Sequence, residues 1–60
     1  MREYDYFYKF NYDTNESKNW TGRVSLTTSI RPCDREVRVK IVNKYDTNKI
    51  FNIRNIRRIN

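Results

Sequence analysis

The fold class of this chain is decided by residues 4–12, which read Tyr-Asp-Tyr-Phe-Tyr-Lys-Phe-Asn-Tyr. Every second position carries an aromatic ring. A period of two indicates a β-strand, because successive side chains of a strand point to opposite faces of its sheet. The aromatic face of the predicted strand consists of Tyr4, Tyr6, Tyr8, Phe10 and Tyr12. The other face consists of Asp5, Phe7, Lys9 and Asn11.

The alternation resumes in residues 20–30, after an all-polar segment at 13–19 that we expect to form a loop. The inward positions of this second strand are Trp20, Gly22, Val24, Leu26 and Ile30. A glycine inside a strand indicates either a bulge or the close approach of another group. Both alternatives stay open for Gly22.

A third strand is predicted over residues 36–43, after a turn at 31–35 that contains Pro32. Its buried face would carry Val37, Val39 and Ile41, and its other face Arg38 and Lys40. Residues 45–48 then form a tight connection. We expect Asn48 to take the left-handed backbone conformation that such connections require.

The last segment repeats isoleucine at every third position, at Ile50, Ile53, Ile56 and Ile59. This spacing fits a helical stripe, but β-branched residues, asparagines and the lack of a capping signal disfavour a helix. We therefore predict a strand through about Arg54, with Phe51 and Ile53 buried. A slip of one residue near Asn55 would keep Ile56 facing inward.

The composition indicates one folded domain over residues 1–60. Aromatic residues make up 15% of the chain, and it has a single Leu and no Ala. Aromatic and β-branched residues are typical of strands, and disordered chains lack them. The predicted fold class is all-β, a small antiparallel sheet or SH3/Sm-like barrel of four to five short strands.

The residue inventory argues against catalysis. With one Cys and no His, the chain has no internal disulfide, no ordinary zinc or haem site and no His-based acid–base group. We therefore predict no enzyme activity, no metal and no cofactor. No apolar run approaches the roughly 20 residues that span a bilayer, and no signal peptide follows Met1. The expected location is the cytoplasm, without membrane contact.

The positive charge is unevenly distributed. The chain carries 13 Lys and Arg against 7 Asp and Glu, a net charge of +6. Residues 1–30 are neutral in sum, so residues 31–60 carry the whole excess. Such asymmetry is typical of a nucleic-acid or acidic-surface ligand, although it also fits a solvated outer face. The candidate anion-binding residues are Arg38, Lys40, Arg54, Arg57 and Arg58.

The aromatic face is longer than the core that a tiny barrel offers. Five residues at alternate positions extend roughly 27 Å at about 3.3 Å per residue. We expect residues 6–10 to be core and the ends to be exposed. The candidate aromatic contacts are Tyr4, Tyr12 and Trp20.

Residues 42–56, Val-Asn-Lys-Tyr-Asp-Thr-Asn-Lys-Ile-Phe-Asn-Ile-Arg-Asn-Ile, resemble the closing hairpin of WYL-type, Sm-like SH3 barrels. In that family a tight turn leads into a basic residue, then Phe-x-aliphatic, then an aliphatic residue three positions on. Lys49, Phe51, Ile53 and Ile56 occupy those places. The resemblance implies a small barrel and a ligand- or nucleic-acid-sensing role, and a free-standing copy resembles the tiny Sm-like proteins of phages.

Two functional hypotheses follow. The first is a non-enzymatic module whose basic β-surface binds nucleic acid or nucleotide phosphate, with aromatic rings available for stacking. The second is a small phage-type protein that binds and inhibits a host enzyme or defence protein. It would act in the host cytoplasm and contact an acidic surface of that partner. A homodimer or higher homo-oligomer is compatible with either hypothesis.

Overall fold

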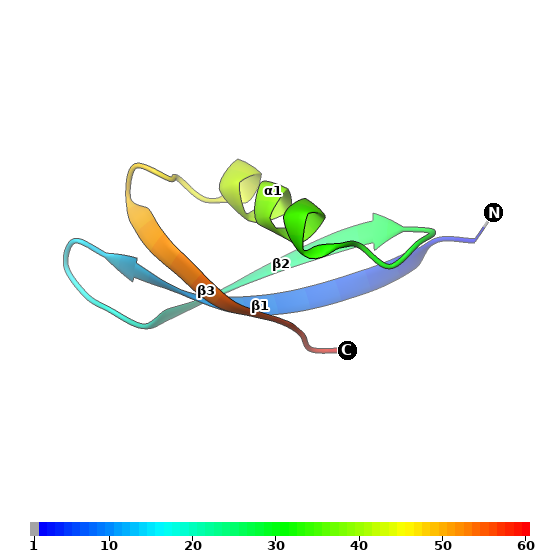
Figure 1. Ribbon diagram of the computed structural model, residues 1–60, viewed down its shortest axis with the longest axis horizontal. Coiled ribbons are helices and arrows are strands. Elements are labelled where there is room, and N and C mark those ends of the chain that lie inside the picture. Colours follow the sequence, from blue (N-terminus) through cyan, green and yellow to red (C-terminus); the bar gives the residue numbers. More distant parts are fainter. Residues whose placement is uncertain (1) are drawn as a thin grey trace.

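The computed structural model describes residues 2–60 and places three strands and one helix along the chain (Figure 1). The elements are β1 (Tyr4–Thr14), β2 (Trp20–Thr28), α1 (Asp34–Lys44) and β3 (Ile50–Arg58). The strands form one antiparallel sheet in the order β2-β1-β3. The helix lies over one face of this sheet and leaves the opposite face without a covering element (Figure 1). The fold is therefore mostly β, with three strands in an open sheet in place of the predicted four to five.

The aromatic face of β1 forms the centre of the core. Tyr8 and Phe10 are buried, and Tyr6 and Tyr12 pack against the core from either side. Tyr4, by contrast, is 48% exposed. An eleven-residue helix is about 16 Å long, whereas an eleven-residue strand spans about 36 Å. The helix is thus too short to cover the whole aromatic face. The predicted core is confirmed at Tyr8 and Phe10, whereas Tyr12, predicted to be exposed, is half-buried against the core.

The strand predicted over residues 36–43 is wrong, because this segment lies within α1. Val37 and Ile41 are four residues apart, on one side of the helix, and both are almost completely buried. Val39, which a strand would have buried with them, is 49% exposed. Residues two positions apart lie about 200° apart around a helix axis. Arg38 and Lys40 therefore do not project together, as the strand prediction required.

Gly22 allows the close approach of an aromatic ring. It lies opposite Phe10, and a Cβ atom at Gly22 would be 2.4 Å from Cζ of that ring. The pairing of β1 with β2 runs without interruption from Tyr4↔Thr28 to Tyr12↔Trp20. Of the two alternatives for Gly22, close approach is thus correct and a bulge is wrong.

Two extra residues in β3 explain its isoleucine spacing. Asp13 and Asn11 of β1 pair with Phe51 and Arg54, so two residues on β1 match three on β3. The same offset recurs between Asn11 and Lys9. Asn52 and Asn55 have φ values of 57° and 55°, in the left-handed region that asparagine tolerates better than most residues. Because of these bulges, every third residue of β3 returns to the core side.

The last segment confirms one expectation, and three others about it and the turn before it are corrected. The slip near Asn55 is confirmed, and Ile53 and Ile56 both pack against the core. Phe51, predicted to be buried, is 51% exposed and lies opposite Asp13, on the side of the sheet away from the helix. The strand continues to Arg58, beyond the predicted end. Asn48 is not among the residues with positive φ, and its N–H donates a hydrogen bond of 2.9 Å to Asp46 Oδ1.

Candidate binding surface

The uncovered side of the sheet, here called the open face, carries the odd-numbered residues of β1. Tyr8 and Phe10 point to the helix, so Phe7, Lys9 and Asn11 point away from it. Residues that pair across antiparallel strands share a face. The open face therefore also includes the partners of these residues on β2 and β3: Thr21, Arg23, Ser25, Arg54 and Arg57.

Three cations lie in one row across the open face. Lys9 on the central strand pairs with Arg23 on β2 and with Arg57 on β3. Directly opposite residues have Cβ atoms about 5 Å apart, and like charges in such pairs destabilise a sheet. Within residues 2–60, ion pairs form only between Arg38 and Asp34 and between Arg54 and Asp13. No carboxylate of the described chain thus neutralises this cation row.

The surroundings of the cation row are polar on one side and aromatic on the other. Phe7, the residue of β1 next to Lys9 on the same face, is 44% exposed. On the other side, Asn11 receives a hydrogen bond of 3.1 Å from Asn55 Nδ2. A shallow hollow of about 110 Å³ lies there, between Lys9, Asn11, Thr21, Asn55 and Arg57. The open face therefore offers cations, amide groups and an exposed ring within a few residues of one another.

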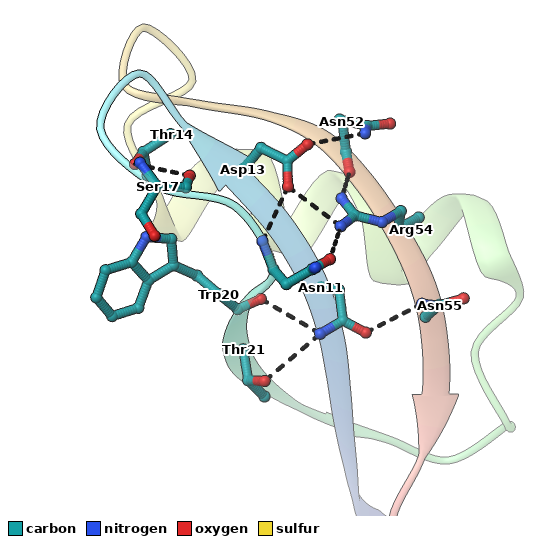
Figure 2. A network of polar contacts seen from close by, with 10 residues as sticks. Asn11, Asp13, Thr14, Ser17, Trp20, Thr21, Asn52, Arg54 and Asn55 are labelled. Atoms are coloured by element: carbon teal, nitrogen blue, oxygen red, sulfur yellow. Dashed lines mark hydrogen bonds and ion pairs between the residues drawn. The ribbon is translucent and has the colours of Figure 1, made fainter.

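Arg54 also belongs to the open face, but internal contacts occupy its guanidinium (Figure 2). Its Nη2 lies 3.1 Å from Asp13 Oδ1 and also contacts Asn19 Oδ1, and its Nη1 donates to Asn52 O at 2.8 Å. The buried Asp13 carboxylate further accepts 2.9 Å and 3.0 Å hydrogen bonds from Asn52 Nδ2 and the Asn19 N–H. These two bonds and Arg54 hold the pKa of Asp13 below its ordinary value. Arg54, predicted as an anion contact, has its guanidinium engaged in these internal contacts.

The other predicted cations lie apart from one another. Arg38 on α1 pairs with Asp34 at 2.9 Å, and Lys40 on the same helix lies near Ser25 of β2. Arg58 is opposite Tyr8 on the covered face, where its guanidinium lies 4.9 Å from the centre of the Tyr6 ring. Of the five predicted residues, only Arg57 joins the cation row.

Sequence reasoning missed three residues of the open face: Phe7, Lys9 and Arg23. Each was assigned to the outward face of its own strand by the period of two. What could not be read from the sequence is the pairing register, which aligns Lys9 with Arg23 and Arg57.

The predicted aromatic contacts lie on the helix side of the sheet. Tyr4 is exposed near one end, with the Arg2 guanidinium 5.2 Å from its ring centre. Tyr12 and the half-exposed Trp20 pair at the other end. The hollow beside them, here called the Trp20 hollow, has a volume of about 510 Å³ and is lined by Tyr12, Thr14, Asn15, Glu16, Trp20, Asn48 and Lys49.

Other chemical features of the described residues are sparse. The exposed Cys33 precedes α1, and its thiol donates a hydrogen bond of 3.4 Å to Glu36 Oε1. Residues 2–60 contain no cluster of three Cys, Asp or Glu side chains able to hold a metal ion. None of their helices is both long and apolar enough to cross a membrane. Comparison with protein-family models, curated proteins and solved structures finds no match.

Proposed function

We propose that this protein binds single-stranded nucleic acid on the open face of its sheet and does not catalyse a reaction. The observation that carries the proposal is the cation row: Arg23, Lys9 and Arg57 face one another without a carboxylate partner. Such an arrangement costs stability in the free protein. An anionic chain laid along the row removes that repulsion and releases its own counterions.

The exposed ring of Phe7 favours a single strand over a duplex. Base faces are hidden in a duplex, whereas unpaired bases stack on aromatic side chains of an open β-surface. Phe7 lies beside the cation row on the same strand. A base stacked on Phe7 would therefore have its neighbouring phosphates near Lys9.

The proposal is tested by fluorescence anisotropy with labelled oligothymidine and oligouridine of about 12 nucleotides, within the range that one small β-module covers. Unlabelled duplex of the same length should compete poorly. Phe7→Ala should weaken binding by about 1–3 kcal/mol, the usual contribution of one stacked base, without changing the salt dependence. Tyr4→Ala is the matched control, because Tyr4 is similarly exposed, at 48% against 44% for Phe7, but lies on the helix side of the sheet.

Equal losses for Phe7→Ala and Tyr4→Ala would contradict stacking on Phe7. Undetectable binding of both oligonucleotides at low ionic strength would refute the proposal itself. The oligothymidine and oligouridine arms distinguish DNA from RNA, because only the latter carries the 2′-hydroxyl group.

Contact with a protein partner is the second candidate, favoured by the Trp20 hollow. Tryptophan and tyrosine are enriched at the centres of protein interfaces, and here Trp20 is 50% exposed beside Tyr12. A phage-type inhibitor of a host enzyme would use this end of the molecule. Recovery of a stoichiometric complex from host lysate, lost in Trp20→Ala, would support this candidate; a complex unaffected by Trp20→Ala would contradict it.

Three further expectations stay predictions: cytoplasmic location, self-association and the resemblance of residues 42–56 to WYL-type barrels. For self-association, the outer edge of β2 is relevant, because the backbone N–H and C=O of Arg23 both bond to the Tyr45 hydroxyl at 3.1 Å. Lys44 Nζ adds a bond of 3.0 Å to the same carbonyl. These contacts occupy groups that a second sheet would need, so we expect self-association to use the β3 edge, and light scattering measures it.

A further inference from the structure

A second basic hollow lies on the covered side of the sheet, between the start of α1 and the end of β3. This edge groove has a volume of about 350 Å³. Its lining includes Arg31, Arg57 and Arg58, together with Tyr8 and Ile56 from the sheet. Asp34 is the acidic residue of the lining, and its carboxylate already pairs with Arg38 at 2.9 Å. The groove is therefore a site of net positive charge.

Arg57 connects the edge groove with the open face. It lines both the shallow hollow beside Lys9 and the edge groove. This double position follows from the topology, because β3 is an outer strand and no further strand separates the two sides of the sheet there. A chain molecule that contacts Arg57 can thus pass around the β3 edge from one hollow to the other.

The two remaining arginines are placed to receive such a chain. Arg31 is exposed and immediately precedes the buried Pro32, which anchors the segment against the fold. Arg58 is held by its position over the Tyr6 ring. Its Nε lies 3.5 Å from Asn60 Oδ1, and neither of its Nη atoms takes part in a hydrogen bond within residues 2–60. The planar guanidinium fork is suited to bidentate contact with a phosphate.

We propose that a bound single strand continues from the cation row over the β3 edge into the edge groove, where Arg31 and Arg58 contact its next phosphates. This inference rests on the proposed function and extends its footprint. The protein then contacts phosphates through five cations in one continuous path: Arg23, Lys9, Arg57, Arg58 and Arg31.

Salt dependence measures the number of phosphate contacts. For a single strand, the logarithm of the binding constant falls with the logarithm of salt concentration with a slope of about −0.7 per contact. The cation row alone gives about −2, and the path of five cations gives about −3.5. A fourfold rise in salt therefore weakens binding about 20-fold in the first case and about 130-fold in the second.

The test compares wild-type protein with Arg31→Gln/Arg58→Gln in titrations of labelled oligothymidine at several salt concentrations. The double variant should flatten the slope by about 1.4 and shorten the oligonucleotide that gives full affinity. Lys18→Gln/Lys49→Gln is the matched control, since it removes the same charge from the two loops at the opposite end of the molecule (Figure 1). If loss of Arg58 disturbs the packing of Tyr6, Arg31→Gln alone provides the test. It should flatten the slope by about 0.7.

The outcomes separate this inference from the proposed function. If Lys9→Gln/Arg23→Gln flattens the slope but Arg31→Gln/Arg58→Gln behaves like the control, the strand ends on the open face and the inference is overturned. If wild-type protein shows no salt-dependent binding, the proposed function fails and the inference falls with it. Flattening by both double variants, with a shorter minimal oligonucleotide for the second, is the result expected.

Discussion

Arg54 Nη2 lies 3.1 Å from Asp13 Oδ1, so this half-buried arginine joins β3 to β1. Asp13 is buried at 6% exposure, and the contact supplies a charge partner for a carboxylate that lies under the β1–β2 loop. The bond between Asn52 Nδ2 and Asp13 Oδ2 spans 39 residues of sequence. This network holds the irregular part of β3 in place and thereby sets the register that brings Arg57 beside Lys9.

Arg54→Gln is expected to lower stability without removing a nucleic-acid contact. The variant should unfold at a lower temperature because Asp13 loses its ion-pair partner. Under conditions where it stays folded, its salt slope should match that of Lys18→Gln. Thermal unfolding followed by circular dichroism and anisotropy titrations measure the two effects. A salt slope flattened by the value of one phosphate contact, with unchanged stability, would mean that Arg54 binds nucleic acid.

Stability should fall in acid through the titration of Asp13. The Asn52 side chain, then the Asn19 N–H and Arg54, lower the pKa of this carboxyl below its ordinary value of 3.8, against the effect of desolvation. The unfolded chain therefore binds a proton at a higher pH than the folded chain does. The stabilisation is complete above the unfolded pKa and is lost as pH falls through the folded pKa.

Urea unfolding from neutral pH down past 3.8 checks this expectation. Asp13→Asn should be less stable than wild type at neutral pH and should show a flatter decline in acid. An identical decline in both proteins would mean that another carboxyl controls acid unfolding.

Gly22→Ala is expected to destabilise the sheet by about 1–3 kcal/mol, the usual cost of overpacking. The added methyl group would meet the Phe10 ring at 2.4 Å. Phe10→Leu removes the atoms that clash, so the double variant should be more stable than the two single effects predict. Chemical denaturation of all four proteins gives this coupling energy. Strict additivity would show that the Phe10 ring does not lie over Gly22.

Asn55→Ala should be less stable than Asn55→Gly by about 1–2 kcal/mol, the cost of the left-handed conformation for a residue with a Cβ atom. Both variants lose the bond between Asn55 Nδ2 and Asn11 Oδ1, so their difference isolates the backbone term. Equal unfolding free energies would argue against a bulge at this position.

The strands with a period of two could be predicted from the sequence because their signal is local. Alternation alone assigns Tyr8, Phe10 and Val24 to the inward face, and all three are buried. The helix could not be predicted in this way, since Val37-Arg-Val-Lys-Ile41 satisfies both periods. Tertiary packing favours the helix, because Val37 and Ile41 cover the aromatic face of the sheet. The local signal was Asp34 and Glu36, acidic residues in the first turn.

The candidate site depends on a register that the sequence does not reveal. Counting back from the Thr14↔Ile50 pair without bulges would place Asn55 opposite Lys9. The extra residues at Asn52 and Asn55 shift the partner to Arg57. Sequence reasoning anticipated one irregularity and not the other, so it could not align the cation row. For the same reason it missed Lys9, and it did not reveal that Arg54, although on the open face, bonds internally to Asp13.

The central claim, that the cation row binds a nucleic-acid strand, is tested most directly by the salt dependence of oligothymidine affinity for Lys9→Gln/Arg23→Gln. Both residues lie on the open face, and neither forms an ion pair in the described chain, so the variant should fold normally. The account predicts a slope flatter than that of Lys18→Gln/Lys49→Gln by about 1.4, the value for two lost phosphate contacts. Equal slopes for the two double variants would contradict it.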